Sequence, residues 1–252
     1  MEDPLRKNTN WYIFFDDGNV LNNNEIRGAQ WKKFLPQFFI SRFGGTEEIW
    51  SQANHRVIDE LMQNLEKRWE TQDRPEDFNE FWQTVMNNWV VHMFEYAGIT
   101  LSDIDRIELF KEVSKFVIPQ VRSANEGVQE TLKILWERGF NLYTASGEVS
   151  WELGGYILGM GCEGYFHDQY YGPDLINEGK LSPQFYKKLF QDVGINPSQA
   201  IVVDDNPFFL EYARDVGAKI IQSNINGSKK KVADYVIIDF REIPDVIDKI
   251  TE

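Results

Sequence analysis

The chain has 252 residues, 42% of them hydrophobic, which is enough for one large or two smaller domains with a buried core. Acidic residues outnumber basic ones by 40 to 26, and the formal net charge of −14 argues against nucleic acid or an anionic membrane as the main partner. A site that handles phosphate would therefore have to be a local positive spot on an acidic protein.

The single cysteine, Cys162, cannot form a disulfide within the chain, which suits a reducing compartment. No histidine lies near it in sequence, so nothing marks it as a nucleophile. The segment Met1–Asn10 is polar and lacks the apolar centre of a signal peptide. No stretch of about 18 apolar residues exists that could span a membrane. We therefore expect a cytoplasmic protein that does not act on a membrane.

The first predicted element is a short buried strand at Tyr12–Phe15. Four bulky apolar residues in a row are typical of a parallel strand whose two faces are both covered by helices. Asp16 and Asp17 follow directly, and Gly18 then begins a turn. Because chemistry in open α/β sheets takes place just beyond the carboxyl ends of the strands, Asp16 becomes the first candidate site residue.

After a polar hinge at Asn22–Asn24, residues 25–117 are predicted to be helical almost throughout. Apolar side chains recur at a spacing of three or four, which gives each helix one apolar face. Breaks at Gly44–Gly45, near Asp73–Pro75 and at Gly98 divide this segment into four helices that can pack as a bundle. Aromatic residues at helical spacing favour core positions, and five tryptophans lie here: Trp31, Trp50, Trp69, Trp82 and Trp89.

From residue 118 onward, short apolar strands alternate with helices. Strands are predicted at 140–143, 200–203, 219–221 and 235–238, and helices at 125–138, 148–158, 183–193, 207–216 and 243–250. This alternation predicts a parallel, doubly wound sheet. The fold class is therefore α/β, with a Rossmann-like core formed by residues 1–24 and 118–252 and an all-α domain, residues 25–117, inserted after the first strand.

Three further stretches place polar residues at predicted strand ends and helix starts. They are Thr144–Ser146, Lys180–Pro183 and the pair Asp204–Asp205. Together with Asp16–Leu21, they resemble the four motifs of the haloacid dehalogenase-like hydrolase superfamily, in the same order and in the expected structural context. The resemblance covers the whole chain and implies that the inserted helical segment is the cap domain of that family.

The resemblance implies a Mg²⁺-dependent hydrolase that acts on a small phosphorylated molecule. Asp16 would be the nucleophile, which attacks phosphorus and forms an aspartyl-phosphate. The family's metal ligands fall on Asp16, Gly18 (through its backbone carbonyl), Asp204 and Asp205. Its phosphate-binding groups fall on Thr144, Ala145, Ser146 and Lys180. The expected catalytic residues are Asp16, Thr144 and Lys180.

A second register of the first motif is open. If Asp17 and Gly18 were the family's Asp-Gly pair, the nucleophile position would fall on Phe15 and the protein could not catalyse. The spacing to Val20–Leu21 favours Asp16 as the nucleophile.

The other assignments have structural alternatives as well. Lys180 could be an ordinary loop lysine, with Lys187 and Lys188 as rivals for its role. Asp205 or Asn206 could serve only to cap the helix that follows. Two adjacent acids after a buried strand are nevertheless costly unless a positive charge compensates them, which favours a metal site.

Gly18 stands where the family has the aspartate that protonates the leaving group and later activates water. General acid-base catalysis of this kind contributes about 10²- to 10⁴-fold, and glycine cannot supply it. Another group, with Glu25 the nearest, could substitute for the acid. The substrate could instead have a good leaving group, as in a sugar 1-phosphate or an acyl phosphate. The third outcome is a protein with weak activity or none.

The expected function is therefore phosphate ester hydrolysis by an aspartyl-phosphate route, with Mg²⁺ as cofactor and a small phosphorylated molecule as partner. The alternative from another class is a non-catalytic binding or regulatory protein. A metal-free dehalogenase is less favoured, because attack on carbon without a metal would not need both Asp204 and Asp205. The substrate and the oligomeric state stay open.

Overall fold

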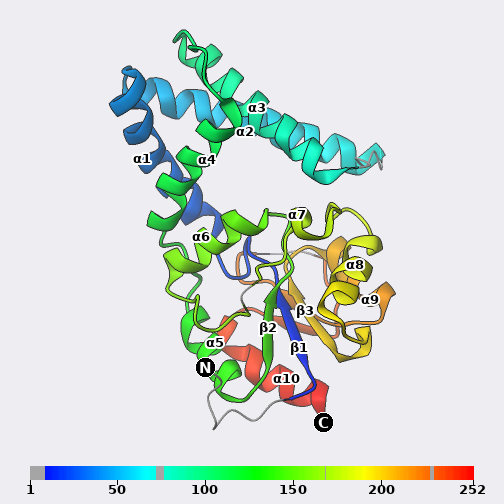
Figure 1. Cartoon of the computed structure of the whole chain (residues 1–252). Coiled ribbons are helices and arrows are strands. Elements are labelled where there is room, and N and C mark those ends of the chain that lie inside the picture. Colours follow the sequence, from blue (N-terminus) through cyan, green and yellow to red (C-terminus); the bar gives the residue numbers. More distant parts are fainter. Residues whose placement is uncertain (1–8, 72–76, 168, 228–229) are drawn as a thin grey trace. The chain divides into compact units, whose positions relative to one another are not determined.

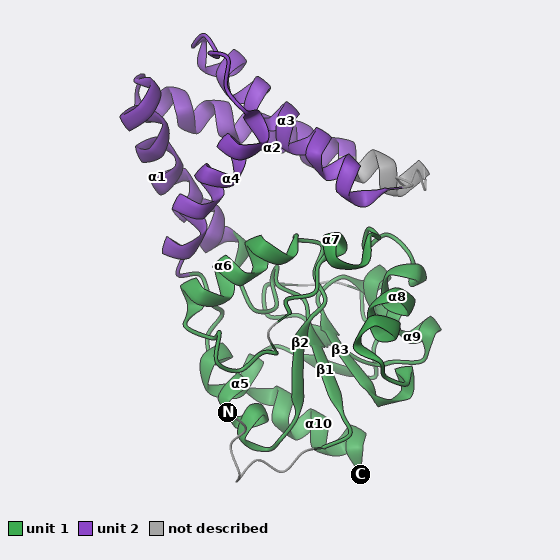
Figure 2. Ribbon diagram, viewed as in Figure 1, with its two compact units in different colours: residues 1–24, 123–252 green, residues 25–122 purple. Residues whose placement is uncertain are grey.

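The structure is a computed structural model of the chain. It describes residues 9–71, 77–167, 169–227 and 230–252, and the side chains of residues 65–71 lie outside the description. The chain forms two compact units, one of residues 1–24 with 123–252 and the other of residues 25–122 (Figure 2). Each unit is described by itself below.

The first unit is built on a five-stranded parallel sheet (Figure 1). Its strands are β1 (Tyr12–Phe15), β2 (Asn141–Thr144), β3 (Ala200–Asp204), β4 (Lys219–Ser223) and β5 (Tyr235–Ile237). Their order in the sheet is β2-β1-β3-β4-β5, so β1 lies between β2 and β3. The predicted parallel α/β sheet is therefore confirmed.

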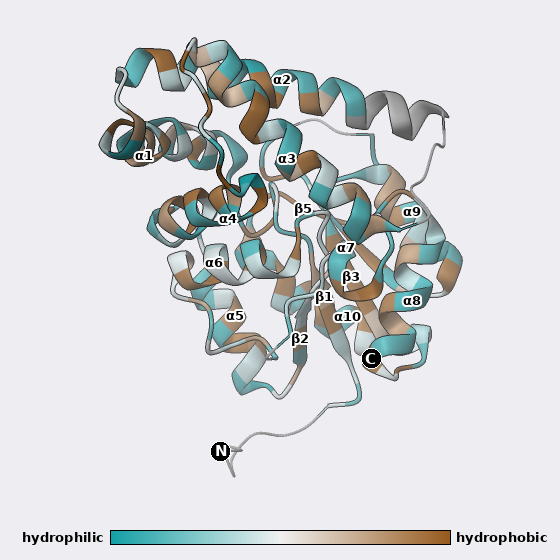
Figure 3. Cartoon of the chain, turned by 45° about the horizontal axis from the view of Figure 1, so that its top comes forward, coloured by the Kyte–Doolittle hydropathy of each residue, from teal (hydrophilic) through white to brown (hydrophobic). Residues whose placement is uncertain are grey.

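Side chains along each strand point alternately to the two faces of the sheet, and helices cover both faces. Six helices belong to the described part of this unit: α5 (Val128–Glu137), α6 (Ser150–Met160), α7 (Pro173–Ile176), α8 (Pro183–Val193), α9 (Pro207–Val216) and α10 (Ile243–Thr251). Ile13 and Phe15 point into a core shared with α5, α6 and α10. Phe14 points the other way, into a core shared with α8 and α9. The strands are apolar on both faces for this reason, as the brown colour of β3 shows in Figure 3.

Two segments differ from the prediction. The helix predicted at 125–138 begins only at Val128, because Gly127 has a positive φ of 81° that keeps it out of the helix. The stretch between the helices predicted at 148–158 and 183–193 contains a further short helix, α7, which begins at Pro173. Proline fits the first position of a helix because it needs no backbone N–H there.

The second unit consists of helices packed through aromatic side chains. Its helices are α1 (Asn24–Phe43), α2 (Glu47–Thr71), α3 (Phe78–Ala97) and α4 (Arg106–Val117). The rings of Phe39 and Trp50 stack with their centroids 4.3 Å apart, and Trp89 meets Phe110 edge-on at 5.1 Å. Among the described residues, none of the helices combines the length and apolar character that crossing a membrane would require.

The tryptophans of this unit follow the prediction only in part. Trp50 and Trp89 are buried, whereas Trp31 and Trp82 are partly exposed. The side chain of Trp69 lies outside the described residues, as does the predicted break at Asp73–Pro75. The unit ends at Arg122 rather than at the predicted residue 117, because a 3₁₀ turn at Ile118–Gln120 continues directly from α4.

The two chain segments that leave and re-enter the first unit are tied together by hydrogen bonds. The Asn23 N–H donates to the Ser123 carbonyl over 2.7 Å, and the Asn125 N–H donates to the Leu21 carbonyl over 2.8 Å. In the same place the Ser123 hydroxyl donates to the Asn22 side chain over 2.6 Å. We call these residues, 21–23 and 123–125, the neck. It holds the ends of the insert side by side.

Candidate active site

The register of the sheet brings three predicted site positions together. Phe15 is paired with Thr144 on one side and with Val203 on the other. The residues that follow them, Asp16, Ala145 and Asp204, therefore meet at the carboxyl edge of the three central strands. This edge is where ligands bind in open α/β sheets.

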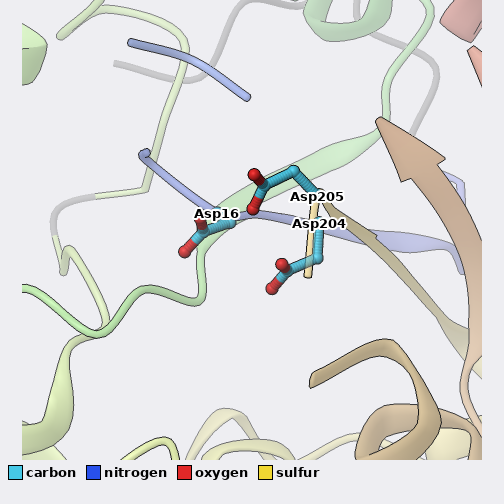
Figure 4. Close-up of side chains that lie close together, drawn as sticks. All are labelled: Asp16, Asp204 and Asp205. Atoms are coloured by element: carbon cyan, nitrogen blue, oxygen red, sulfur yellow. The ribbon is translucent and has the colours of Figure 1, made fainter. Parts of the chain in front are cut away.

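Asp16, Asp204 and Asp205 form an acidic cluster at this edge (Figure 4). Each offers a carboxylate oxygen, and these oxygens all lie within 4.8 Å of one another. Asp204 is fully buried, whereas Asp16 and Asp205 each keep about a tenth of their surface exposed, at 9%. Asp16 and Asp205 therefore reach the surface with a small part of their area, and the oxygen donors of the cluster could hold a hard cation.

The buried side chain of Lys180 binds two of these carboxylates. Its Nζ lies 2.8 Å from Asp16 Oδ1 and 2.6 Å from Asp204 Oδ2, and it donates a third hydrogen bond of 2.6 Å to the Ala145 carbonyl. The side chain of Lys180 is 2% exposed. The rival lysine, Lys188, instead pairs with Glu178 at 2.9 Å. Lys180, rather than Lys188, is thus the lysine that contacts Asp16 and Asp204.

Burial and charge set the protonation of this group. Burial by itself lowers the pKa of Lys180, but the carboxylates of Asp16 and Asp204 outweigh it and raise the pKa well above its ordinary value. Burial raises the pKa of Asp204 to about 7, against the opposing effect of Lys180. The Lys180 ammonium thus contacts two of the three carboxylates directly, those of Asp16 and Asp204.

Asp205 and Asn206, which follow β3, have different roles. Asn206 is the N-cap of α9, because its side chain accepts a hydrogen bond of 3.0 Å from the Phe208 N–H. Its own N–H donates to Asp204 over 2.8 Å. The capping role that the sequence left open for Asp205 is therefore taken by Asn206, and the Asp205 carboxylate belongs to the acidic cluster.

Asn19 orients Asp205 and was not singled out from the sequence. Its Nδ2 donates to Asp205 Oδ2 over 3.1 Å, and its backbone has a φ of 57°. Asparagine is one of the few residues besides glycine that visits this left-handed region. The turn Gly18–Asn19 suggests such a backbone in the sequence, but nothing there indicates that the side chain would reach a residue after β3.

The donors predicted to hold phosphoryl oxygens at the end of β2 are arranged differently from the expectation. The Thr144 hydroxyl donates to the Tyr171 carbonyl over 3.1 Å, and the Ala145 N–H donates to the Phe15 carbonyl over 2.8 Å as part of the sheet. Neither is free to hold an anion in this arrangement. The Ser146 hydroxyl accepts from the Glu148 N–H over 3.2 Å and, among the described residues, donates to none. Of these three predicted groups, Ser146 is therefore the one that keeps a donor without an acceptor in the described part of the chain.

The loop that carries Ser146 is held against Gly172 at very short range. A Cβ at position 172 would lie 2.1 Å from the Glu148 carbonyl oxygen and 3.0 Å from the Ser150 N–H nitrogen. We expect Gly172→Ala to lower the free energy of unfolding by about 1–3 kcal/mol, because backbone atoms would have to move apart. Urea denaturation measures this change.

The same loop offers a matched control for that substitution. A Cβ at Gly147 would meet nothing within 4 Å, and its backbone is not in the left-handed region. Gly147→Ala should therefore change the free energy of unfolding by less than about 0.5 kcal/mol. Equal losses in the two variants would contradict the close packing described for Gly172.

Phe15 and Asp17 lie outside the acidic cluster. Phe15 is fully buried in the core that β1 shares with α5 and α10, where its ring meets that of Phe240 at 5.7 Å. Asp17 is also buried, and its Oδ1 accepts a hydrogen bond of 2.5 Å from Asn22. If Phe15 held the nucleophile position, that side chain would therefore point into the core.

Cys162 is fully buried in the hydrophobic core of the first unit and should be unreactive. Burial raises the pKa of its thiol to about 12, so its reactive thiolate is scarce at neutral pH. We expect no reaction of the native protein with a thiol reagent such as dithionitrobenzoate at pH 8, and one equivalent of reaction in denaturant. Fast labelling of the native protein would contradict this prediction.

Comparison with solved structures shows the same fold along nearly the whole chain. The magnesium-bound HAD-hydrolase YfnB of Bacillus subtilis aligns over 96% of this chain and 100% of its own, with a TM-score of 0.66 and 14% identity. A 2-haloacid dehalogenase of Pseudomonas syringae aligns over 95% and 98%, with a TM-score of 0.64 and 18% identity. A HAD phosphatase of Thermococcus onnurineus aligns over 94% and 97%, with a TM-score of 0.58 and 17% identity.

Similarity at these levels of sequence identity indicates a shared fold but not a shared reaction. The similar proteins include both phosphatases and dehalogenases. No curated protein sequence matches the chain. The sequence pattern of the haloacid dehalogenase-like hydrolases, however, matches residues 14–217, which begin within β1 and end just after α9. With the parallel sheet and its acidic edge, this match shows that the chain belongs to the haloacid dehalogenase-like hydrolase family.

Proposed function

We propose that the protein is a Mg²⁺-dependent phosphatase of a small phosphorylated molecule, with Asp16 as the nucleophile. One observation carries the proposal. Asp16 contacts the buried Lys180 ammonium and lies at the carboxyl edge of the sheet with two further carboxylates, Asp204 and Asp205. The helical unit, residues 25–122, is assigned the role of the family's cap.

The residues of the cluster fit a divalent cation. All three donors are carboxylate oxygens, which hard cations such as Mg²⁺ prefer. Asp16, Asp204 and Asp205 would hold the ion, together with the backbone carbonyl of Gly18. When bound, it would draw a carboxylate and a phosphate together and reduce their repulsion.

The chain's own residues account for the rest of the reaction. Asp16 would attack phosphorus with one carboxylate oxygen, forming an Asp16–phosphorus bond while the bond to the leaving group breaks. Lys180 would hold Asp16 in place and balance charge as the phosphoryl group approaches. The Ser146 hydroxyl would donate to a phosphoryl oxygen. Water would then attack phosphorus and release Asp16 as a carboxylate.

A dehalogenase is the second candidate, because two of the structures described above show that this fold supports both reactions. Attack on carbon needs no metal and therefore gives Asp204 and Asp205 no role as metal ligands. The presence of both carboxylates beside Asp16 argues for the phosphatase. A protein that binds a ligand without turnover is the remaining alternative.

The test is hydrolysis of p-nitrophenyl phosphate by the full chain. This substrate has a good leaving group, so the glycine at position 18 does not prevent its turnover. We expect activity that disappears with EDTA and returns with added Mg²⁺. Parallel assays with 2-chloropropionate should release no chloride. Chloride release that is insensitive to EDTA would replace the phosphatase with the dehalogenase, and no turnover of either substrate would favour the binding protein.

A further inference from the structure

The space next to Gly18 is filled by the side chain of Asn24. A Cβ built on Gly18 would lie 3.0 Å from Asn24 Nδ2, 3.2 Å from its Oδ1 and 3.5 Å from its Cγ, and these are the three nearest atoms. A carboxyl group on residue 18 would begin about 1.5 Å beyond that Cβ. The Asn24 carboxamide therefore occupies the volume into which an aspartate at position 18 would project.

The Asn24 carboxamide forms no hydrogen bond in the described part of the chain, whereas those of Asn22 and Asn23 do. Asn22 bonds Asp17 and Ser123, and Asn23 donates to Asn226 over 3.4 Å. Asn24 Oδ1 is buried without a hydrogen-bond partner in the described part of the chain. A buried acceptor with no partner costs about 1–3 kcal/mol, so Oδ1 calls for a donor on a bound molecule. Asn24 Nδ2 likewise donates to no acceptor in the described part of the chain, so it can donate to such a molecule. The three heavy atoms nearest to a Cβ at Gly18 all belong to Asn24, and none belongs to Glu25, the substitute considered from the sequence.

We infer that Asn24 takes the place of the missing acid as a hydrogen-bonding group that contacts the leaving-group oxygen but transfers no proton. The inference rests on the proposed phosphatase function and names its substrate class. That class is phosphates whose leaving group departs as a stable anion, such as acyl or aryl phosphates.

The chemistry follows from what a carboxamide can do. It has two N–H donors and one acceptor oxygen and does not titrate between pH 4 and 10. In the first step the phosphorus–oxygen bond to the leaving group breaks while the bond to Asp16 forms, and the electron pair leaves with the oxygen. The Asn24 N–H stabilises that anion, with no proton transferred. In the second step water attacks phosphorus, Asp16 departs as carboxylate, and a proton of the water passes to the phosphate released.

The substitution that tests this assignment is Asn24→Asp, which keeps the shape of the side chain and makes it titratable. The readout is the ratio of kcat/KM for p-nitrophenyl phosphate to kcat/KM for phenyl phosphate, measured across pH with saturating Mg²⁺. We expect a high ratio in the wild type. In Asn24→Asp the ratio should fall by about 10- to 100-fold, because a carboxylic acid can protonate the poorer leaving group. A new pH dependence of kcat/KM should appear with it.

Asn23→Asp is the matched control, because it adds the same charge one residue away. Its ratio should equal that of the wild type. A similar ratio for Asn24→Asp and the wild type, in protein whose circular dichroism and melting temperature show a native fold, would overturn the inference and leave the phosphatase standing. So would a wild type that hydrolyses both esters equally well. A wild type that hydrolyses neither ester with Mg²⁺ would overturn the proposed function and this inference with it.

Discussion

Asp16→Asn should reduce metal-dependent phosphatase activity by a factor on the order of 10⁴ or more, because the amide cannot form the phosphorylated intermediate. The fold should survive the change, since Lys180 keeps its 2.6 Å contact with Asp204. The measurement is kcat/KM for p-nitrophenyl phosphate with Mg²⁺, accompanied by the melting temperature. Retention of activity by a folded Asp16→Asn variant would exclude Asp16 as the nucleophile.

The adjacent acid provides the matched control for this experiment. Asp17 is buried and accepts its hydrogen bond from Asn22, and an asparagine at position 17 could still accept that bond through its oxygen. Asp17→Asn should therefore keep kcat/KM within about tenfold of the wild type. A large loss in Asp17→Asn with none in Asp16→Asn would reverse the register assigned to the first motif.

Lys180→Met should destabilise the protein by about 3–5 kcal/mol at pH 8 in the absence of divalent cations, and it should abolish activity. Its ammonium is the shared partner of Asp16 and Asp204, and removing one partner of a buried ion pair leaves the other charges uncompensated. Urea denaturation at constant ionic strength measures the loss. Lys188→Met is the control, because the Lys188–Glu178 pair is partly exposed and should contribute no more than about 1 kcal/mol.

The pH dependence of the Lys180→Met variant follows from Asp204. Its pKa is already raised by burial from 3.8 to about 7, and loss of the ammonium, which lowers it, would raise it further. At pH values between the pKa of Asp204 in the unfolded chain and its pKa in the folded protein, the folded state binds the proton more tightly than the unfolded chain does. The free energy of unfolding of this variant should therefore increase as the pH falls from 8 toward 5. A variant equally stable at both pH values would contradict this account of the cluster.

The sheet and the motif positions could be predicted from sequence because each depends on local patterns. The run Tyr12–Phe15 is apolar at every position since helices cover both faces of β1, and the helix after Ser182 begins with a capping side chain and a proline. Parallel strands then bring their carboxyl ends to one edge. The meeting of Asp16 with Asp204 follows from topology alone.

Other parts of the site depend on contacts that leave no periodic signal. The Thr144 hydroxyl reaches the carbonyl of Tyr171, 27 residues away, and a backbone acceptor can belong to any residue type. Asn24 could be seen as part of a polar hinge, but its position against Gly18 depends on how the chain turns between them. The sequence therefore located Asp16 and Lys180, whereas the hydrogen bonding of Thr144 and the position of Asn24 required coordinates.

The neck has a consequence for how freely the insert can vary in length. Because the Asn23 N–H and the Ser123 carbonyl are hydrogen-bonded at 2.7 Å, residues 25–122 form a closed loop whose ends are fixed by the first unit itself. The entropic cost of closing such a loop grows only with the logarithm of its length, by about 0.6 kcal/mol for each doubling. A core of this kind can therefore exchange, shorten or lengthen its insert at little thermodynamic cost, while the acidic edge of the sheet stays unchanged.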